Sequence, residues 1–208
     1  LQWSKSKEAT QLTALAAFEY GITDRLEFDW EVPYVFLNPS DDTSHNGIGD
    51  VEIALRYAVK DFRTEPVALN VGLGAELPTG DNGKDLGEGR VSLVPFFTVA
   101  HWFGRVNTQF NFAWRRAVGN GGTEPKDTSD VNLALLVPVG QWFFGLEGNG
   151  EFSRAADKVL ITPELIWKPT PHTELLLAAP LGVTPDTADY SVIASFTLEF
   201  TTGLQRHG

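Results

Sequence analysis

The chain has 208 residues, enough for one sizeable domain, and no low-complexity stretch marks a linker. Its 16 Lys and Arg against 27 Asp and Glu give a net charge of −11, which disfavours nucleic acid or an anionic membrane surface as an electrostatic partner. The absence of Cys excludes disulfides and cysteine metal sites, and no run of about 18 apolar residues predicts a spanning helix.

The residue pattern predicts an all-β chain. The sequence contains 20 Gly, 14 Phe and 6 Trp and has no long amphipathic helix pattern. Apolar and polar residues alternate, poorly in 91–103 and more clearly elsewhere, in the twelve stretches expected to form strands: 1–4, 10–22, 26–36, 51–62, 67–77, 91–103, 106–114, 131–139, 142–152, 159–167, 173–183 and 190–200. Strict alternation places successive side chains on opposite faces of a strand.

The stretch 26–36 shows what this alternation implies. Its acids Glu27, Asp29 and Glu31 share one face, while large apolar residues such as Phe28 fill the other. In a soluble sandwich the apolar face would meet a dry core. In a membrane barrel it would meet lipid, and the carboxylates would line a wet lumen. A closed barrel is the only way that this chain could cross a bilayer, because every backbone group in lipid must be paired internally.

The connections between strands favour the barrel. Short connections at 23–25, 63–66 and 104–105 alternate with long ones at 38–50, 78–90 and 119–130. Outer-membrane barrels combine tight periplasmic turns with long extracellular loops in this way, whereas a Greek-key sandwich does not need such parity. Aromatic residues also gather near the ends of the strands, as a membrane girdle should. The predicted girdle is Tyr20, Trp30, Tyr34, Trp102, Trp114, Trp142, Trp167 and Phe200.

We therefore predict an antiparallel up-and-down transmembrane β-barrel of about 12 strands, formed as one domain by residues 1–208. The sequence begins without Met or a signal peptide, so we expect a processed or truncated start and a short first strand. Closure should pair residues 1–4 with the outer half of 190–200. Residues 201–208 form a tail beyond the last strand.

Three motifs carry a family resemblance. They are the run from Glu19 to Glu27, the Gly47-x-Gly49-Asp50-Val51 start of a strand, and Leu-Pro-Thr-Gly-Asp at 77–81. From about Glu19 onward the chain resembles the outer-membrane barrel family of the MetA-pathway-of-phenol-degradation type. The resemblance implies a role in moving small compounds, aromatic ones included, across the outer membrane, and it brings no catalytic residues. The tail beyond Phe200 departs from barrels that end at the aromatic residue.

The inward face predicted for the barrel is acidic. The expected lumen acids are Glu19, Glu27, Asp29, Glu31, Glu52, Glu76, Glu147, Glu151, Glu164, Glu174 and Glu199, and the expected bases are Arg56, Lys60, Arg115 and Lys168. Rings of carboxylates raise the local cation concentration, which would make the lumen favour cations. Alternatively, these groups form a solvated, salt-bridged interior that only fills the barrel.

No pattern indicates catalysis, a metal or a cofactor. Residues 81–88 have the acids and glycines of a calcium loop but miss its spacing, and the glycine pairs 47/49 and 87/89 lead into strands and not into a phosphate-binding helix. The histidines show no metal-ligand spacing: His45, His101, His172 and His207.

Three functions fit this sequence. The first is a passive channel for small, aromatic or cationic solutes in the bacterial outer membrane, in contact with its lipid. The second is a closed structural or interaction barrel that belongs to a larger outer-membrane assembly with a protein partner. The third is a soluble β-barrel that binds a ligand and would fold without detergent. Barrels of about eight strands are filled and those of sixteen or more leave a channel, so an intermediate size separates none of these.

Overall fold

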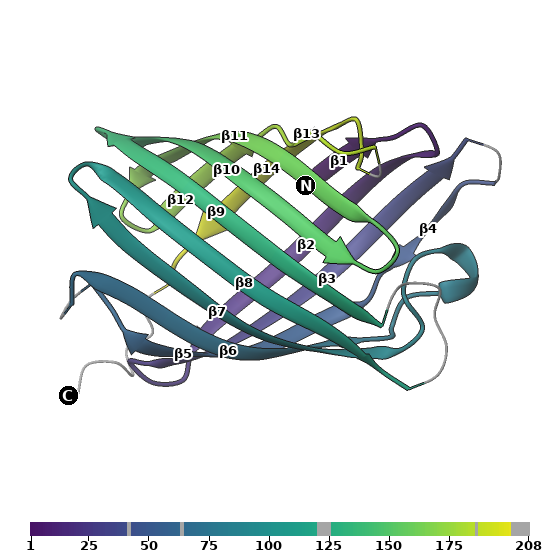
Figure 1. Cartoon of the computed structure of the whole chain (residues 1–208), viewed down its shortest axis with the longest axis horizontal. Helices are drawn as coiled ribbons and strands as arrows, with labels where there is room; N and C mark the ends of the chain where they lie inside the picture. The colour runs from purple at the N-terminus through teal and green to yellow at the C-terminus, as the bar shows by residue number, and fades with distance from the viewer. Residues whose placement is uncertain (41–42, 63–64, 120–125, 186, 201–208) are drawn as a thin grey trace.

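The alternating stretches form one closed antiparallel β-barrel (Figure 1). The computed structural model describes residues 1–40, 43–62, 65–119, 126–185 and 187–200. The strands are β1 (Gln2–Lys5), β2 (Ala9–Gly21), β3 (Leu26–Pro39), β4 (His45–Ile48), β5 (Val51–Lys60), β6 (Val67–Leu77), β7 (Val91–Phe103), β8 (Val106–Val118), β9 (Asp127–Val139), β10 (Trp142–Ser153), β11 (Asp157–Thr170), β12 (Thr173–Ala178), β13 (Leu181–Gly182) and β14 (Tyr190–Leu198). The predicted tail 201–208 lies outside the described residues.

Two of these segments complete a neighbouring strand, so the barrel wall has twelve strands, as the alternation predicts. Strand β4 pairs with the outer part of β3 and β5 pairs with its inner part. Strand β13 continues the path of β12 beside β11 and β14 after an interruption at Ala179 and Pro180. Proline cannot donate a ladder hydrogen bond, which explains a break at this point.

Closure occurs between the two ends of the described chain. Strand β1 pairs with β14 from Gln2 opposite Ile193 to Lys5 opposite Tyr190. This is the outer half of the last strand, so the predicted closure is confirmed. Because β1 is short, it pairs with β2 only along residues 10–13 and with β14 only along residues 190–193, so the seam is paired in its outer part.

The two ends of the barrel differ in their connections. One end carries the connections 22–25, 61–66, 104–105, 140–141 and 171–172, and the turns 104–105 and 140–141 each place a glycine, Gly104 or Gly140, at positive φ. The opposite end, on the right in Figure 1, carries β4 and the 3-10 turn η1 (Asn82–Lys84). The predicted alternation of lengths is incomplete, because this second end also holds a three-residue connection at 154–156.

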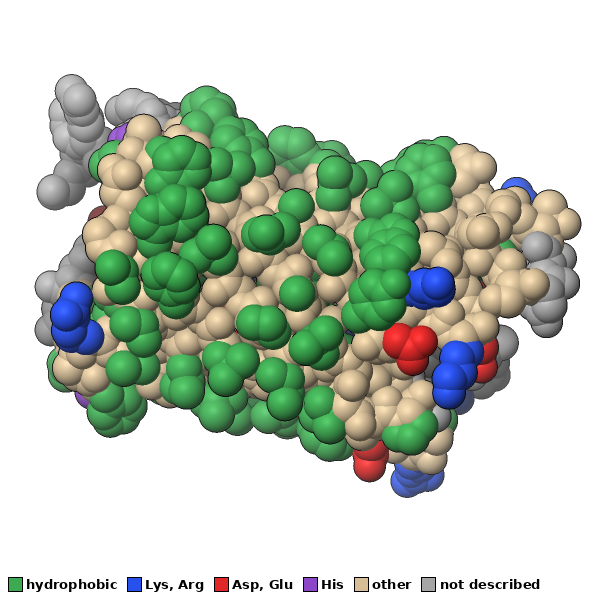
Figure 2. Space-filling view, turned by 90° about the horizontal axis from the view of Figure 1, so that it is seen from above, with side chains coloured by type: hydrophobic (Ala, Val, Ile, Leu, Met, Phe, Trp, Pro, Cys, Tyr) green, Lys and Arg blue, Asp and Glu red, His purple; other side chains and the backbone are tan. Residues whose placement is uncertain are grey.

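The apolar side chains lie mainly on the outside. Trp30, Phe144 and Phe196 are exposed by 44%, 54% and 63%, whereas Val35, Ile166 and Leu86 are among the few buried apolar residues. Figure 2 shows apolar side chains over the middle of the barrel and charged ones gathered near the loop end. No dry core of the kind that a soluble sandwich needs is present in the described residues.

The height of the apolar surface matches a membrane. Trp142 and Phe152 both face outward at opposite ends of β10. Their separation along the strand is about 33 Å, and a tilt of about 40° reduces it to about 25 Å across the membrane. This is about the height of the apolar band on outer-membrane barrels.

Candidate functional site: the lumen

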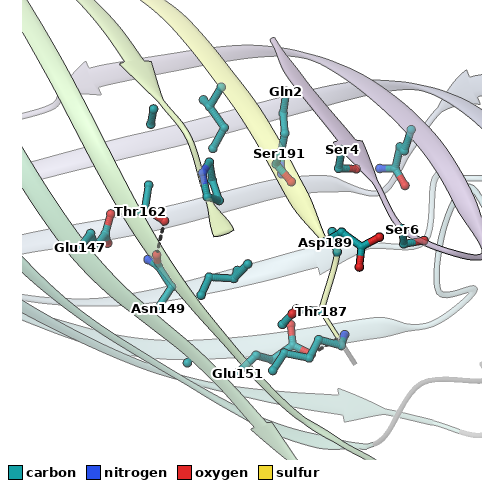
Figure 3. A pocket seen from close by; sticks show the side chains of 18 of the residues that line it. Gln2, Ser4, Ser6, Glu147, Asn149, Glu151, Thr162, Thr187, Asp189 and Ser191 are labelled. Carbon is teal, nitrogen blue, oxygen red and sulfur yellow. Dashed lines mark hydrogen bonds and ion pairs between the residues drawn. The ribbon is translucent and has the colours of Figure 1, made fainter. Parts of the chain in front are cut away.

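The inward face is identified by a cavity of about 960 Å³. Gln2, Ser4 and Ser191 line it from β1 and β14, and Asn149 and Thr162 line it from β10 and β11 (Figure 3). Strand pairing carries this inward face around the barrel, because residues opposite one another in neighbouring strands project to the same side. The register therefore assigns each strand residue either to the lumen or to the outer surface.

One wall of the lumen, on β2, β3 and β5, is rich in carboxylates. Glu19 lies opposite Asp29, and Glu27 lies opposite Arg56, all on the inward face. The Arg56 guanidinium makes ion pairs at 3.0 Å with both Glu27 and Asp29. The single positive charge of Arg56 is therefore shared by two carboxylates within the wall.

Three glutamates form a continuous row next to Arg56 and its two carboxylate partners. Glu31 lies opposite Glu52, and Glu52 lies opposite Glu76. The Nε atom of Arg115 on β8 is 3.5 Å from a Glu76 carboxylate oxygen, and this is the ion pair that the row makes among the described residues. Like charges directly opposite across a sheet repel each other, so this row favours a cation between or in front of them.

The remaining inward charges of the strands lie on β9 to β12, and Lys7, Glu8 and Asp189 line the cavity from connecting segments. Glu151 is 2.9 Å from Lys158, and Glu174 is 2.8 Å from Lys168, whose ammonium also lies 5.5 Å from the centre of the Phe143 ring. Glu147 lies opposite Thr162, and Glu164 lies opposite Gly145. Neither Glu147 nor Glu164 makes an ion pair within the described part of the chain.

Neutral amides and hydroxyls on β7 to β11 are hydrogen-bonded to one another across the inward face. Asn111 donates a hydrogen bond to Thr98 at 3.1 Å, and Asn149 donates one to Asn132 at 3.2 Å. The Thr162 hydroxyl in turn donates to the Asn149 side-chain oxygen at 2.8 Å. These bonds fix the side chains across neighbouring strands and leave a polar, uncharged stretch of wall.

A long loop, residues 78–90, folds over the lumen wall at the loop end. Its position is set by Asp50, whose two carboxylate oxygens accept hydrogen bonds from the N–H groups of Gly80 at 2.8 Å and Glu88 at 2.6 Å. Leu86 is then buried against Gly47 and Gly49: a Cβ on Gly47 would come within 3.0 Å of a Leu86 methyl, and one on Gly49 within 3.3 Å of its carbonyl oxygen. The loop thus narrows the mouth of the barrel.

The rest of this loop is held by local charge pairs. Lys84 lies 3.0 Å from Asp81, and its hydrogen bond lowers the pKa of that carboxyl group, with a further contribution from the Gly83 N–H. The buried Arg90 lies with its Nε 3.6 Å from Glu88. None of these contacts follows from the periodicity of the strands.

Two expected positions need correction. A register shift between Ala58 and Lys60 places Lys60 opposite Leu69 on the outer face, where it pairs at 3.8 Å with Glu65. Trp102, expected in the outer girdle, lies opposite the buried Asn107, which puts it on the inward face near the short turn. The bulge before Lys60 and the poor alternation in 91–103 explain why the sequence pattern did not predict the faces of these two residues.

The other expected residues are placed as follows. Tyr20, Trp30, Tyr34 and Trp114 project outward, and Trp142 stacks on Trp167 with ring centres 5.5 Å apart. Phe200 and Glu199 follow the end of β14, and Phe200 is 81% exposed. Asp130 and Lys158 line the cavity although both lie outside the predicted strands, because β9 and β11 begin earlier than the alternation indicates.

The described residues contain neither a metal-binding group of side chains nor a membrane-spanning helix. No group of three or more His, Asp or Glu side chains among them is placed to hold a metal ion. In the same residues, no helix is long and apolar enough to span a bilayer.

A closed barrel with an apolar outer band and a charged interior is the architecture of outer-membrane β-barrels, and this is the class of the protein. The chain belongs to the family described as "Putative MetA-pathway of phenol degradation", whose sequence pattern matches residues 4–200. This confirms the resemblance seen in the motifs at 19–27, 47–51 and 77–81. No curated protein is significantly similar to the sequence.

Solved structures with the same fold include an outer membrane channel from Pseudomonas putida F1. The two chains share 15% identity, with a TM-score of 0.75 over 96% of this chain and 92% of the channel, so the likeness concerns the fold. A porin structure is also similar, at 11% identity and a TM-score of 0.48, over 94% of this chain and 63% of the porin.

Proposed function

We propose that the protein is an outer-membrane channel that passes small solutes and favours cations. The observation that carries this proposal is the excess of carboxylates on the inward face. By strand register this face holds the acids Glu19, Glu27, Asp29, Glu31, Glu52, Glu76, Asp130, Glu147, Glu151, Glu164 and Glu174, and the bases Arg56, Arg115, Lys158 and Lys168. Such an excess concentrates cations in a narrow, water-filled passage.

The outer surface and the similar channel structure support an outer-membrane location. An exposed apolar band about 25 Å high fits the hydrocarbon of an outer membrane, and aromatic residues such as Trp30 and the stacked pair Trp142 and Trp167 fit its interfaces. The similar outer membrane channel supports the same setting through its fold.

The test is the reversal potential of single channels in planar bilayers under a KCl gradient. If the lumen is cation-selective, the reversal potential has the sign of the K⁺ equilibrium potential. An anion-selective value from well-folded protein would contradict the proposed selectivity, and the complete absence of current would contradict the channel itself.

A closed interaction barrel is the second candidate, and two observations favour it. Leu86 covers part of the wall at the loop end, and the Phe96 ring lies across Gly72, where an added Cβ would come within 2.1 Å of it. Both side chains take up space inside the barrel. Folded protein that conducts no ions and is retained by another outer-membrane protein would support this second function.

A further inference from the structure

The cavity combines charged, apolar and hydroxyl groups in a fixed order across the wall. Glu164 lies opposite Ala178, Ala178 lies opposite Ile193, and Ile193 lies opposite Gln2. Neighbouring strands are about 4.8 Å apart, so the carboxylate-bearing strand and Ile193 are separated by about 10 Å. Leu176, from the row below, adds a further apolar side chain to the lining.

The carboxylates at one end of this row have no cationic partner. Glu147 and Glu164 are diagonal neighbours on β10 and β11, because Glu147 lies opposite Thr162 and Glu164 lies two residues further along. No ion pair of either residue is formed within the described part of the chain. By contrast, Glu151 on the same wall is neutralised by Lys158 at 2.9 Å. The pair can therefore attract a cation that the protein does not itself supply.

A buried hydroxyl is directed into the cavity from the other end. Ser191 is only 4% exposed, lines the cavity and is seen among its labelled side chains in Figure 3. Its backbone N–H donates to the Pro180 carbonyl at 2.8 Å, and its side chain faces the cavity. The hydroxyl can therefore exchange a hydrogen bond with cavity water for one with a ligand.

The apolar part of the lining decides the kind of cation. Leu160, Leu176 and Ile193 line the cavity around the carboxylates and Ser191. A hydrated metal ion would gain nothing from these side chains, and the described residues hold no cluster of three ligands for it. An organic cation would bury its apolar body against them.

We propose that this cavity is a binding site for amphiphilic primary ammonium ions. The ammonium group donates its hydrogen bonds to Glu147 and Glu164, the apolar body covers Ala178, Leu176 and Ile193, and a polar group at the far end reaches Ser191. A volume of about 960 Å³ accommodates a small organic ligand together with water. This proposal rests on the proposed cation-favouring lumen and names its solute class.

The experiment measures binding apart from conduction. The full chain in non-ionic detergent micelles is titrated calorimetrically with 3-phenylpropylammonium and with 3-phenylpropanol, a neutral analogue that partitions into micelles and apolar surfaces alike. We expect saturable binding of the ammonium ion and much weaker binding of the alcohol. Equal binding of the two compounds would overturn the proposal, because carboxylate recognition would then contribute nothing.

Matched variants locate the site. Glu147→Gln with Glu164→Gln should weaken ammonium binding about a hundredfold or more, since each of the two lost charge-assisted hydrogen bonds is worth about 1.5–3 kcal/mol. Glu31→Gln with Glu52→Gln removes the same charge from another wall and should change it much less. Equal weakening by both pairs would overturn the site in favour of a diffuse negative field.

A charge-neutral variant keeps the test independent of folding effects at the glutamates. Ser191→Ala leaves every carboxylate in place and should weaken binding severalfold, whereas unchanged affinity in this variant and in the Glu147/Glu164 pair would overturn the site. The reversal potential reports on conduction alone. Cation selectivity without ammonium binding would therefore reject this site and keep the proposed function. Ammonium binding without conduction would keep this site and reject the proposed channel.

Discussion

The Glu164 side chain lies directly over Gly145 on the neighbouring strand. A Cβ atom added to Gly145 would come within 2.3 Å of the Glu164 Cγ and 2.4 Å of its Oε1. Because Gly145 has no side chain, the carboxylate can lie close to the lumen wall instead of extending freely into water. The glycine thus sets the position of one of the two unpaired carboxylates.

Gly145→Ala should displace the Glu164 carboxylate without changing any charge. We expect 3-phenylpropylammonium to bind about three- to tenfold more weakly, a loss of about 0.7–1.4 kcal/mol. Gly148→Ala on the same strand is the control, because its added Cβ would meet no atom within 4 Å. If both variants bound the ammonium ion like the parent chain, the position of Glu164 would not matter for binding.

The row of Glu31, Glu52 and Glu76 should dominate ion preference near the loop end. Replacing Glu31 and Glu52 by Gln removes two charges that Arg115 does not pair with directly, so the reversal potential in a KCl gradient should move toward zero. Asp85→Asn with Asp157→Asn removes two charges from the loop and the outer rim and should have a smaller effect. A larger shift from this control pair would place the selectivity outside the lumen.

Asp50 should determine how firmly loop 78–90 is held over the mouth. Asp50→Asn replaces one of the two acceptors for the Gly80 and Glu88 N–H groups by a donor, at a cost of about 1–3 kcal/mol for the unsatisfied group. Hydrogen exchange of the loop amides, measured by mass spectrometry, should then accelerate about 5- to 100-fold. Unchanged exchange would mean that Leu86 alone fixes the loop. Asp85→Asn in the same loop serves as the control.

The barrel could be predicted from the sequence because its rule is local. Alternation assigns each residue to lipid or lumen, and this was sufficient for the twelve strands and the closure of β1 on β14. It fails where the rule is interrupted. A bulge before Lys60 reverses the face of one residue, and Trp102 continues a strand whose two faces are both apolar.

The loop and the ligand cavity could not be predicted, for a different reason. The Asp50 carboxylate accepts hydrogen bonds from N–H groups that are 30 and 38 residues away in the sequence. The spacing of the loop residues does not predict such contacts. Likewise, Asp130 and Lys158 resemble loop residues until the pairing of β9, β10 and β11 is known. Tertiary pairing, not periodicity, brings these groups together.

The closing seam offers a direct test of the barrel. Leu1 and Ala194 exchange both backbone hydrogen bonds, at 2.7 and 2.8 Å. Because such pairs alternate along an antiparallel ladder, Ser4 and Ser191 form a non-hydrogen-bonded pair with Cα atoms about 4.5 Å apart. That spacing suits a disulfide, and the chain contains no Cys that could compete.

The variant with Ser4→Cys and Ser191→Cys should therefore oxidise to a disulfide and lose its free thiols. Because the bond closes nearly the whole chain into a loop, it should stabilise the folded barrel by about 4–5 kcal/mol, seen as a folded gel band that persists in detergent to higher temperature. Ser4→Cys with Ser195→Cys is the control, since the second position lies about 13 Å further along β14 and should leave both thiols free. Rapid oxidation of this control, or free thiols in the first variant under oxidising conditions, would show that β1 and β14 do not meet in this register.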